Sequence, residues 1–193
     1  ATGDKALVPD ADPDKTITYN KEKHVLTAEQ WDQYKENRNK TAYEMLTRLI
    51  NDEDYQNAND AAQAQMIKNI WSYADKIGKQ AVFPDYEVEE KGDPVAKATL
   101  EGKVTARKTD MMTALETGDY DGYDTMVEAL HELGVEDSEI KTKIGNTYRD
   151  QYKEAYRKGD EAKMAEIEDI LDNTGFVFDI EKWERDVDEK YGL

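Results

Sequence analysis

One stretch of the sequence occurs twice, and this repetition constrains the fold more than any other feature. Residues Ala114–Val135 return later in the chain as Ala155–Phe176. The matching positions are Gly118 with Gly159, Asp119 with Asp160, Met126 with Ile167, Leu130 with Leu171, and Gly134 with Gly175. Each copy predicts the end of one helix, a tight Gly-Asp turn, a second helix and a glycine stop.

The Gly-Asp pair predicts a helix hairpin with almost no loop. Glycine can adopt the left-handed conformation that ends a helix, and the aspartate after it can accept from free N–H groups of the next helix. We expect Gly118 and Gly159 to be left-handed helix ends, Asp119 and Asp160 to be N-caps, and the paired helices to be antiparallel. The repeat favours an all-α protein, with helical hairpins in a bundle or a short solenoid-like array.

The charge and the missing residue types exclude several functions. The 193 residues carry a formal net charge of −18, and 36 % of them are charged. Such a surface repels the phosphates of nucleic acids and anionic membranes, so we expect no direct binding to either. The sequence has no cysteine, which excludes disulfides, thiolate catalysis and cysteine-based zinc sites. It also has no apolar run long enough for a membrane-spanning helix.

Proline, glycine and charge clusters divide the chain into four segments. Residues 1–15 are acidic and contain two prolines, which predicts a linker. Residues 16–83 are expected to form a β-hairpin followed by two helices, and residues 84–94, with two prolines and a glycine, a second linker. Residues 95–193 form the predicted repeat domain. The chain begins with Ala1, and both ends resemble cuts through a modular protein, so we expect a longer parent chain.

Periodicity and capping signals place the individual elements. Ile17–Tyr19 and His24–Leu26 predict a small hairpin with its turn at residues 20–23. Thr27 and Gln30 have the spacing of a capping box. Residues 51–58 are predicted to be a turn, and Asp179 to cap the last helix. Helices are predicted over residues 28–50, 60–82, 95–117, 120–133, 138–158, 161–173 and 180–190.

The first two helices have apolar faces at helical spacing. Their stripes are Trp31, Tyr34, Tyr43, Leu46, Leu49 and Ile50 in the first helix, and Met66, Ile67, Ile70, Trp71, Ala74 and Ile77 in the second. We expect both faces to be buried and Trp31 to touch Trp71. Residues 35–40 are polar all round, so the first helix is expected to bend there or to stand clear of the core.

No pattern in the sequence predicts a catalytic, cofactor-binding or metal-binding residue. His24 lies in the expected hairpin, and His131 lies near a helix end without the second histidine of a zinc-protease helix. Phosphate loops, dinucleotide-binding glycines and nucleophile elbows are missing. Asp119, Asp121 and Asp124 cluster at a helix start, where the helix dipole explains them. We therefore expect no enzymatic activity, no cofactor and no metal.

Five aromatic residues are candidates either for the core or for a surface that faces a partner. They are Trp31, Trp71, Tyr148, Tyr152 and Trp183. Tyr148, Tyr152 and Tyr156 recur at every fourth position of a helix, a spacing that favours core packing over a binding stripe.

Residues 26–81 resemble a helical module of very large tailed-phage proteins. The motifs are a Leu-Thr pair, an aromatic-polar-polar-Tyr, a Tyr-x-x-Leu helix, a tyrosine at the turn and a Tyr-Ala in the second helix. Here they are Leu26 and Thr27, Trp31 and Tyr34, Tyr43 and Leu46, Tyr55, and Tyr73 and Ala74. The repeat half, with Tyr152–Tyr156 before Gly159 and Asp160, is similar to helical segments of the same proteins. One departure is Asn39, which stands where the module usually has glycine.

The resemblance implies a structural role in the virion, in the portal, the tail or the internal ejected proteins, and it supplies no catalytic residues. It also implies that the partners are other virion chains or further copies of this chain, and that the chain is made in the host cytoplasm. The net charge leaves a second hypothesis open, an acidic decoy that inhibits a nucleic-acid-binding host defence factor. However, the acidic residues alternate with lysine and arginine, which favours ordinary surface pairing.

Overall fold

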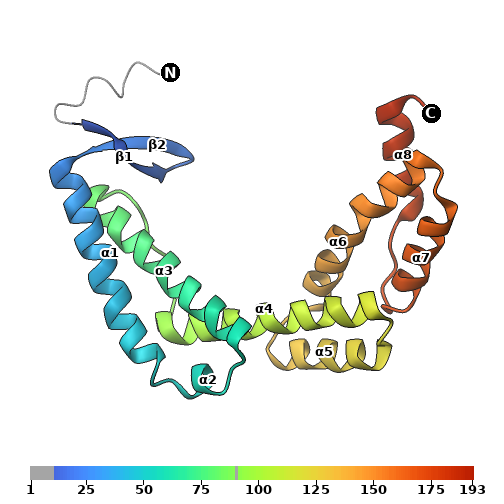
Figure 1. The fold of residues 1–193 in the computed structure, drawn as a ribbon, viewed down its shortest axis with the longest axis horizontal. Coiled ribbons are helices and arrows are strands. Elements are labelled where there is room, and N and C mark those ends of the chain that lie inside the picture. Colours follow the sequence, from blue (N-terminus) through green and yellow to red (C-terminus); the bar gives the residue numbers. More distant parts are fainter. Residues whose placement is uncertain (1–10, 90) are drawn as a thin grey trace. The chain divides into compact units, whose positions relative to one another are not determined.

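The computed structural model describes residues 11–89 and 91–193, and the described chain is mainly helical. The elements are β1 (Ala11–Tyr19), β2 (Glu22–Thr27), α1 (Ala28–Leu49), α2 (Glu53–Gln56), α3 (Asp60–Val82), α4 (Pro94–Thr117), α5 (Tyr120–Glu132), α6 (Asp137–Lys158), α7 (Glu161–Asp172) and α8 (Ile180–Tyr191) (Figure 1). This confirms the predicted all-α class with one small hairpin. Within the described ranges, no helix has both the length and the apolar character of a membrane span.

The chain divides into two compact units, and the division falls within α4. Unit 1 ends at Lys103, and unit 2 runs from Val104 to Leu193, whereas the sequence favours a boundary at residues 84–94. The first turns of α4 pack closely on α3, because a Cβ atom on Gly102 would lie 2.5 Å from Cγ of Met66. The start of α4 therefore belongs to unit 1.

The β-hairpin is longer and tighter than the sequence predicts. Tyr19 pairs with Glu22, so the turn contains Asn20 and Lys21 alone and not residues 20–23. Both turn residues have positive φ, 49° and 64°, as a two-residue type I′ turn requires. Residues 11–15, predicted to be part of a linker, belong to β1, and the rest of that linker lies outside the described residues. The polar character of Glu22 and Lys23 concealed their place in a strand.

The hairpin is held by packing on unit 1 helices. Ile17 and Leu26 are buried together with Tyr34 of α1. On the other side, the Tyr19 ring stacks on Phe83 with 4.6 Å between ring centroids. An isolated hairpin is marginally stable in water, so these contacts supply the apolar burial that it needs.

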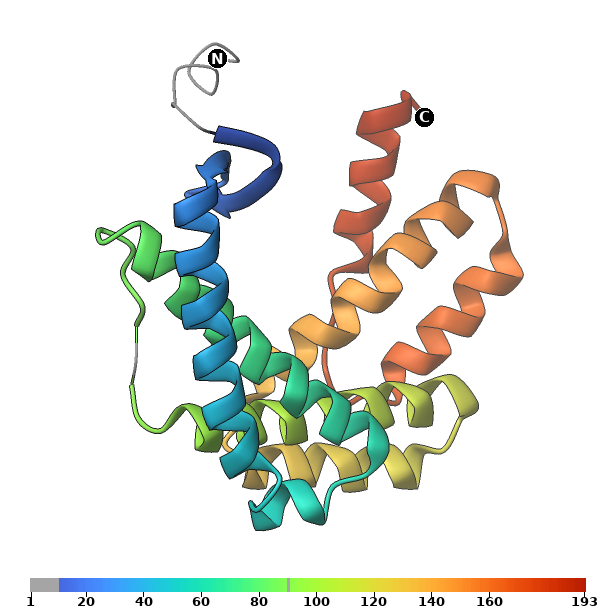
Figure 2. The ribbon, with the colours of Figure 1, turned by 60° about the vertical axis from the view of Figure 1, so that its left-hand side comes forward.

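Helices α1 and α3 lie side by side in both views (Figures 1 and 2), and small residues set how closely they approach. Ala42 and Ala74 are fully buried. A Cβ atom on Gly78 would lie 2.8 Å from the backbone oxygen of Tyr34. The predicted face of α3 is buried at Met66, Ile70 and Ala74, and partly buried at Ile67, Trp71 and Ile77. Gly78 therefore lets α3 approach both the backbone and the ring of Tyr34 closely.

The predicted apolar stripe of α1 was wrong at two positions. Tyr43 is 64 % exposed and Ile50 is 55 % exposed. Ala42 and Leu49, one residue before each, are fully buried. The pattern misled because the small Ala42 carries little hydrophobic signal, although it is fully buried.

The polar middle of α1 does not interrupt the helix, and it does not stand clear of its surroundings. Helix α1 is continuous, and the Arg38 guanidinium lies 5.2 Å from the Tyr34 ring centroid and 6.0 Å from that of Trp71. Trp31 packs on Tyr34 at 5.4 Å, while Trp71 meets Tyr43 edge-on at 6.3 Å. The expected Trp31–Trp71 ring contact is not among the ring contacts of the described residues, since Arg38 reaches over Trp71.

Capping signals placed most helix starts correctly. Thr27 and Gln30 form the predicted capping box, and the Asn59 side chain accepts from the N–H of Ala62. Asp52 caps α2, a short helix inside the segment predicted to be a turn. A helix of this length has too few residues to show periodicity, which is why the sequence did not reveal it.

Unit 2 contains the repeat in the predicted form. Gly118 and Gly159 end α4 and α6 with φ of 73° and 68°. The N–H of Asp119 bonds to Ala114 and that of Asp160 to Ala155, each at 2.9 Å, which completes the Schellman motif of a glycine-ended helix. The helices on either side of each turn run antiparallel (Figures 1 and 2). The hairpin prediction is confirmed in both copies.

The second glycine of each copy is also left-handed, with φ of 83° at Gly134 and 77° at Gly175. The core of unit 2 lies between the hairpins and includes Tyr123, Leu130, Tyr148, Tyr152 and Leu171. The Tyr123 hydroxyl donates to the backbone oxygen of Thr174 at 2.7 Å. This bond joins the two copies of the repeat at a fully buried position.

Candidate functional site

The aspartates of the repeat are fully used as helix caps. The Asp119 side chain accepts from the N–H of Gly122 at 2.9 Å, and that of Asp160 from the N–H of Lys163 at 3.0 Å. Asp179 has the same role in α8, where it accepts from the N–H of Lys182 at 3.0 Å. These carboxylates satisfy the orphan donors of helix starts and have a structural explanation that needs no ligand.

The five candidate aromatic residues separate into two groups. Tyr148, Tyr152 and Trp183 are buried in the core of unit 2. Trp31 and Trp71 are half-buried in unit 1. The spacing argument for core packing therefore holds in α6, and both tryptophans of unit 1 keep a partly exposed edge.

Tyrosine hydroxyls tie α6 to the carboxylates of its neighbouring helices. Tyr152 donates to Glu168 of α7 at 3.0 Å and to Glu184 of α8 at 2.8 Å. Tyr156 donates to Asp188 at 3.0 Å. Burial raises the pKa of Tyr152 far above its usual range, and the hydrogen bonds to Glu184 and Glu168 raise it further. These phenols are held as neutral donors and are unsuited to act as bases.

Tyr148 differs from its neighbours in α6. Its hydroxyl is buried and has no hydrogen-bond partner among the described residues. Burial raises its pKa to about 12, with smaller contributions from Glu116 and Glu166. An unsatisfied buried hydroxyl costs roughly 1–3 kcal/mol, so Tyr148 is a weak point in the core of unit 2.

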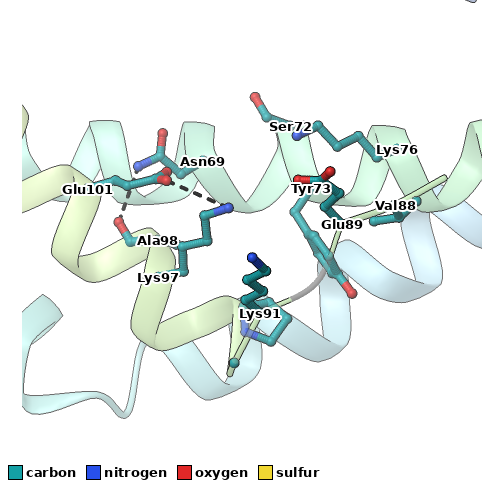
Figure 3. A pocket seen from close by; sticks show the side chains of 12 residues that line it. Asn69, Ser72, Tyr73, Lys76, Val88, Glu89, Lys91, Lys97, Ala98 and Glu101 are labelled. Atoms are coloured by element: carbon teal, nitrogen blue, oxygen red, sulfur yellow. Dashed lines mark hydrogen bonds and ion pairs between the residues drawn. The ribbon is translucent and has the colours of Figure 1, made fainter.

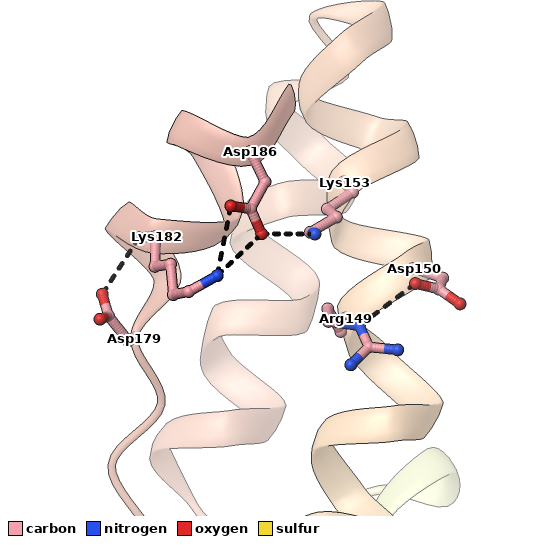
Figure 4. A network of polar contacts seen from close by, with 6 residues as sticks. All are labelled: Arg149, Asp150, Lys153, Asp179, Lys182 and Asp186. Atoms are coloured by element: carbon pink, nitrogen blue, oxygen red, sulfur yellow. Dashed lines mark hydrogen bonds and ion pairs between the residues drawn. The ribbon is translucent and has the colours of Figure 1, made fainter. Parts of the chain in front are cut away.

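An ion-pair network joins the outer faces of α6 and α8 (Figure 4). Asp186 lies 2.8 Å from Lys153 and 3.2 Å from Lys182. Both lysines hold the pKa of the Asp186 carboxyl below its usual range, with the hydrogen bond from Lys153 as the largest cause. Arg149 bonds to the adjacent Asp150 at 3.3 Å through Nε. The network links the two helices along one side.

Beside this network a groove of about 450 Å³ opens between α6 and the start of α8. We call it the α6–α8 groove, and its defining residues are Lys141, Gly145, Arg149, Phe178, Asp179 and Trp183. A second groove of about 260 Å³ continues along the same helices, with Asp150, Lys153, Glu154, Arg157 and Asp186 in its lining. The charges of the second groove are paired with one another, as in Lys153–Asp186 and Arg157–Glu154.

The α6–α8 groove was missed in the sequence. Its floor joins Gly145 to Phe178 and Trp183, which come from a different helix and the segment before it. The one available signal was Gly145, because a glycine inside a helical pattern often marks a close approach by another group. A Cβ atom at that position would lie 3.3 Å from Cε1 of Phe178.

Unit 1 has a smaller pocket, of about 120 Å³, between α3, the segment before α4 and the first turns of α4. Lys91 and Lys97 lie on one side of it, and Asn69 and Tyr73 of α3 lie across from them (Figure 3). Glu89 and Glu101 also line the pocket. The mixture of lysines and carboxylates gives this pocket no clear preference for an anion or a cation.

The two histidines have local partners. His131 Nε2 lies 2.6 Å from Oδ1 of Asp137, at the junction of α5 and α6. His24 Nε2 lies 3.3 Å from the backbone oxygen of Tyr19. In the ranges that the structure describes, no three His, Asp or Glu side chains are grouped so that they could hold a metal ion.

Comparison with known proteins adds no identification. No protein-family model matches the sequence, and no curated protein or solved structure matches it significantly.

Proposed function

We propose that the chain is a structural and interaction module of a tailed-phage virion and that it has no catalytic activity of its own. One observation carries this proposal: the side chains that could form an active site already have structural roles. Asp119, Asp160 and Asp179 cap helices, and Tyr152 and Tyr156 bond to carboxylates on neighbouring helices. Groups from which an active site could be built serve here to fix helices against one another.

The resemblance of residues 26–81 to helical modules of large phage proteins supports the assignment to a virion. That segment covers β2 in part and α1–α3, which pack on one another within unit 1. In such a module the partners are other virion chains or further copies of this chain. The grooves along α6 and α8 supply surfaces on which a partner could lie.

Mass spectrometry of purified virions of the encoding phage tests the proposal. We expect the chain at a constant ratio to the major capsid protein, retained after washing at high salt. Particles made with a stop codon in the gene are the matched control, and they should lack the chain's peptides. If the chain is missing from wild-type particles, the proposal is overturned.

The acidic decoy is less well supported by the described ion pairs. Lysine and arginine side chains neutralise acidic residues from other elements, as in Arg48–Asp93, Lys103–Asp54 and Lys108–Glu139. A decoy needs carboxylates in rows like the phosphates of a nucleic acid. Pull-down from host lysate distinguishes the two hypotheses, because recovery of a basic nucleic-acid-binding protein, released by salt, would favour the decoy.

A further inference from the structure

The floor of the α6–α8 groove is rigid and aromatic. The Phe178 ring packs close to Gly145, where an added Cβ atom would lie 3.3 Å from its Cε1. Its centroid is 6.1 Å from that of Trp183, which is 8 % exposed and belongs to the core of unit 2. Trp183 in turn packs on Tyr152 with 5.9 Å between ring centroids. The floor is therefore preorganised, which reduces the conformational entropy that a bound apolar group must overcome.

The rim of the same groove is cationic. Lys141 is exposed, and its Nζ atom lies 5.7 Å from the Phe178 ring centroid. Arg149 also lines the groove, and its ion pair with Asp150 involves Nε at 3.3 Å and not the terminal nitrogens. Asp179 is the one carboxylate in the lining, and it already accepts the backbone N–H of Lys182. In a chain with a net charge of −18, this lining holds two cations against one carboxylate.

We propose that the α6–α8 groove is a docking site for an acidic segment of a partner protein, with a large apolar side chain between carboxylates. The apolar side chain would lie on Phe178 and Trp183. The flanking carboxylates would pair with Lys141 and with the terminal nitrogens of Arg149, whose planar guanidinium suits carboxylate geometry. This inference rests on the proposed function, since it names the chemistry by which the module would hold a neighbouring chain.

A nucleic acid is a poorer occupant because of what lies beyond the groove. The second groove along the same two helices has three carboxylates, of Asp150, Glu154 and Asp186, against three cations, of Lys153, Arg157 and Lys190. A phosphate backbone longer than the α6–α8 groove would therefore find no net attraction beyond it, and its many charges would meet more repulsion from the net charge of −18 than the few charges of a short peptide. A short acidic peptide can place its charges on the two cations without entering the second groove.

Titration of the full isotope-labelled chain, followed by NMR, tests the proposal. The probes are the capped peptide Gly-Glu-Glu-Phe-Glu-Glu-Gly, its counterpart with lysine in place of glutamate, and a single-stranded oligothymidylate. We expect saturable shifts of the Gly145 amide and the Trp183 indole N–H with the glutamate peptide, and none with the other two. Replacing the central phenylalanine of the peptide by glycine should remove the Trp183 shift.

Charge-reversal variants assign the binding to the rim. The double variant Lys141→Glu, Arg149→Glu should bind the glutamate peptide about tenfold more weakly, since two partly exposed ion pairs become repulsive. Lys143→Glu is the control for charge reversal outside the groove lining: it reverses one cation on the same helix, against two in the double variant, and it should leave the affinity within about twofold. Preserved spectra of the free variants verify folding.

Several results would overturn the inference. These are equal binding of both peptides, binding of the oligothymidylate at the groove, shifts confined to other residues, or an unchanged affinity of the double variant. If the groove fails in this way while the chain is present in purified virions, the virion role stands and this docking site alone is rejected.

Discussion

Two helix contacts in this protein differ in their share of small and aromatic residues. In unit 1, α1 and α3 approach closely at Gly78, where an added Cβ would lie 2.8 Å from the backbone oxygen of Tyr34, and the one buried tyrosine of α1, Tyr34, donates to Asp75 of α3. In unit 2, α6 meets its neighbours through Tyr148 and Tyr152. Aromatic side chains bury more surface, but each tyrosine also brings a hydroxyl that needs a partner. The first contact is therefore sensitive to volume, and the second to hydrogen bonding and ionisation.

Alkaline pH should have the largest effect, and it should act mainly on unit 2. Burial raises the pKa of Tyr123 and of Tyr148 to about 12, from an ordinary value of 10.0. Because the fold favours the neutral phenol, this contribution to stability is fully present below pH 10.0 and is lost as the pH rises through about 12. In the described part of unit 1 the pKa is raised at Tyr34, by burial and by its bond to Asp75.

Tryptophan fluorescence can follow the two units separately during this titration. The variant Trp31→Phe, Trp71→Phe keeps Trp183 as a reporter of unit 2, and Trp183→Phe keeps the two reporters of unit 1. We expect the Trp183 signal to change at lower pH than the unit 1 signal. Coincident curves would contradict the idea that buried phenols distinguish the units.

Gly78→Ala tests the sensitivity of the α1–α3 contact to volume. Alanine is the better helix former by about 1 kcal/mol, but the new Cβ would lie 2.8 Å from a backbone oxygen of Tyr34, which cannot move without shifting α1. Overpacking of this kind typically costs about 1–3 kcal/mol, so we expect a net loss of about 2 kcal/mol in the free energy of unfolding.

Gly145→Ala is the matched control for this substitution. Its Cβ would lie 3.3 Å from Cε1 of Phe178, a ring that can shift slightly, so crowding and the gain in helix propensity should nearly cancel. Urea unfolding of both variants gives the comparison. If Gly78→Ala is as stable as Gly145→Ala, the close backbone approach in unit 1 does not control its stability.

The caps should contribute equally in the two copies of the repeat. Asp119→Ala and Asp160→Ala each remove one side-chain bond to a helix start, at 2.9 and 3.0 Å, and each should cost about 1 kcal/mol. Asp121→Ala is the control, since it removes a charge from the first turn of α5 without removing the cap, and it should cost about 0.3 kcal/mol. If urea unfolding shows unequal losses at Asp119 and Asp160, the two copies of the repeat also differ in how much their caps stabilise the fold.

These caps also show which parts of the fold are readable from the sequence. A Gly-Asp turn is decided by the backbone freedom of glycine and by one side chain next to it, so Gly118, Asp119, Gly159 and Asp160 were placed correctly. Buried faces are decided by a partner helix, and the sequence alone does not show where it lies. This is why Tyr43 was predicted to be buried, although Ala42 is the buried residue and Tyr43 is exposed.

The α6–α8 groove lies beyond sequence reasoning for a related reason. Phe178 and Gly145 are far apart in the chain, and their contact depends on how the segment after α7 crosses α6. The sequence offered Trp183 as a candidate for the core or for a partner surface, but it could not show that Lys141 and Arg149 border the same depression. A groove is a property of several elements together, whereas capping and periodicity describe one element at a time.

The smallest effect is expected at Tyr148. The sign of the change in stability should distinguish its hydroxyl from that of Tyr152. Tyr148→Phe removes a buried hydroxyl without a partner among the described residues, so it should leave stability unchanged or raise it by up to ~1 kcal/mol. Tyr152→Phe removes bonds to Glu168 and Glu184 and should cost about 1–2 kcal/mol. Urea unfolding at neutral pH measures both. An equal loss of stability in both variants would mean that the Tyr148 hydroxyl also has a partner, such as a buried water molecule. The buried tyrosine hydroxyls on the inner face of α6 would then all be hydrogen-bonded.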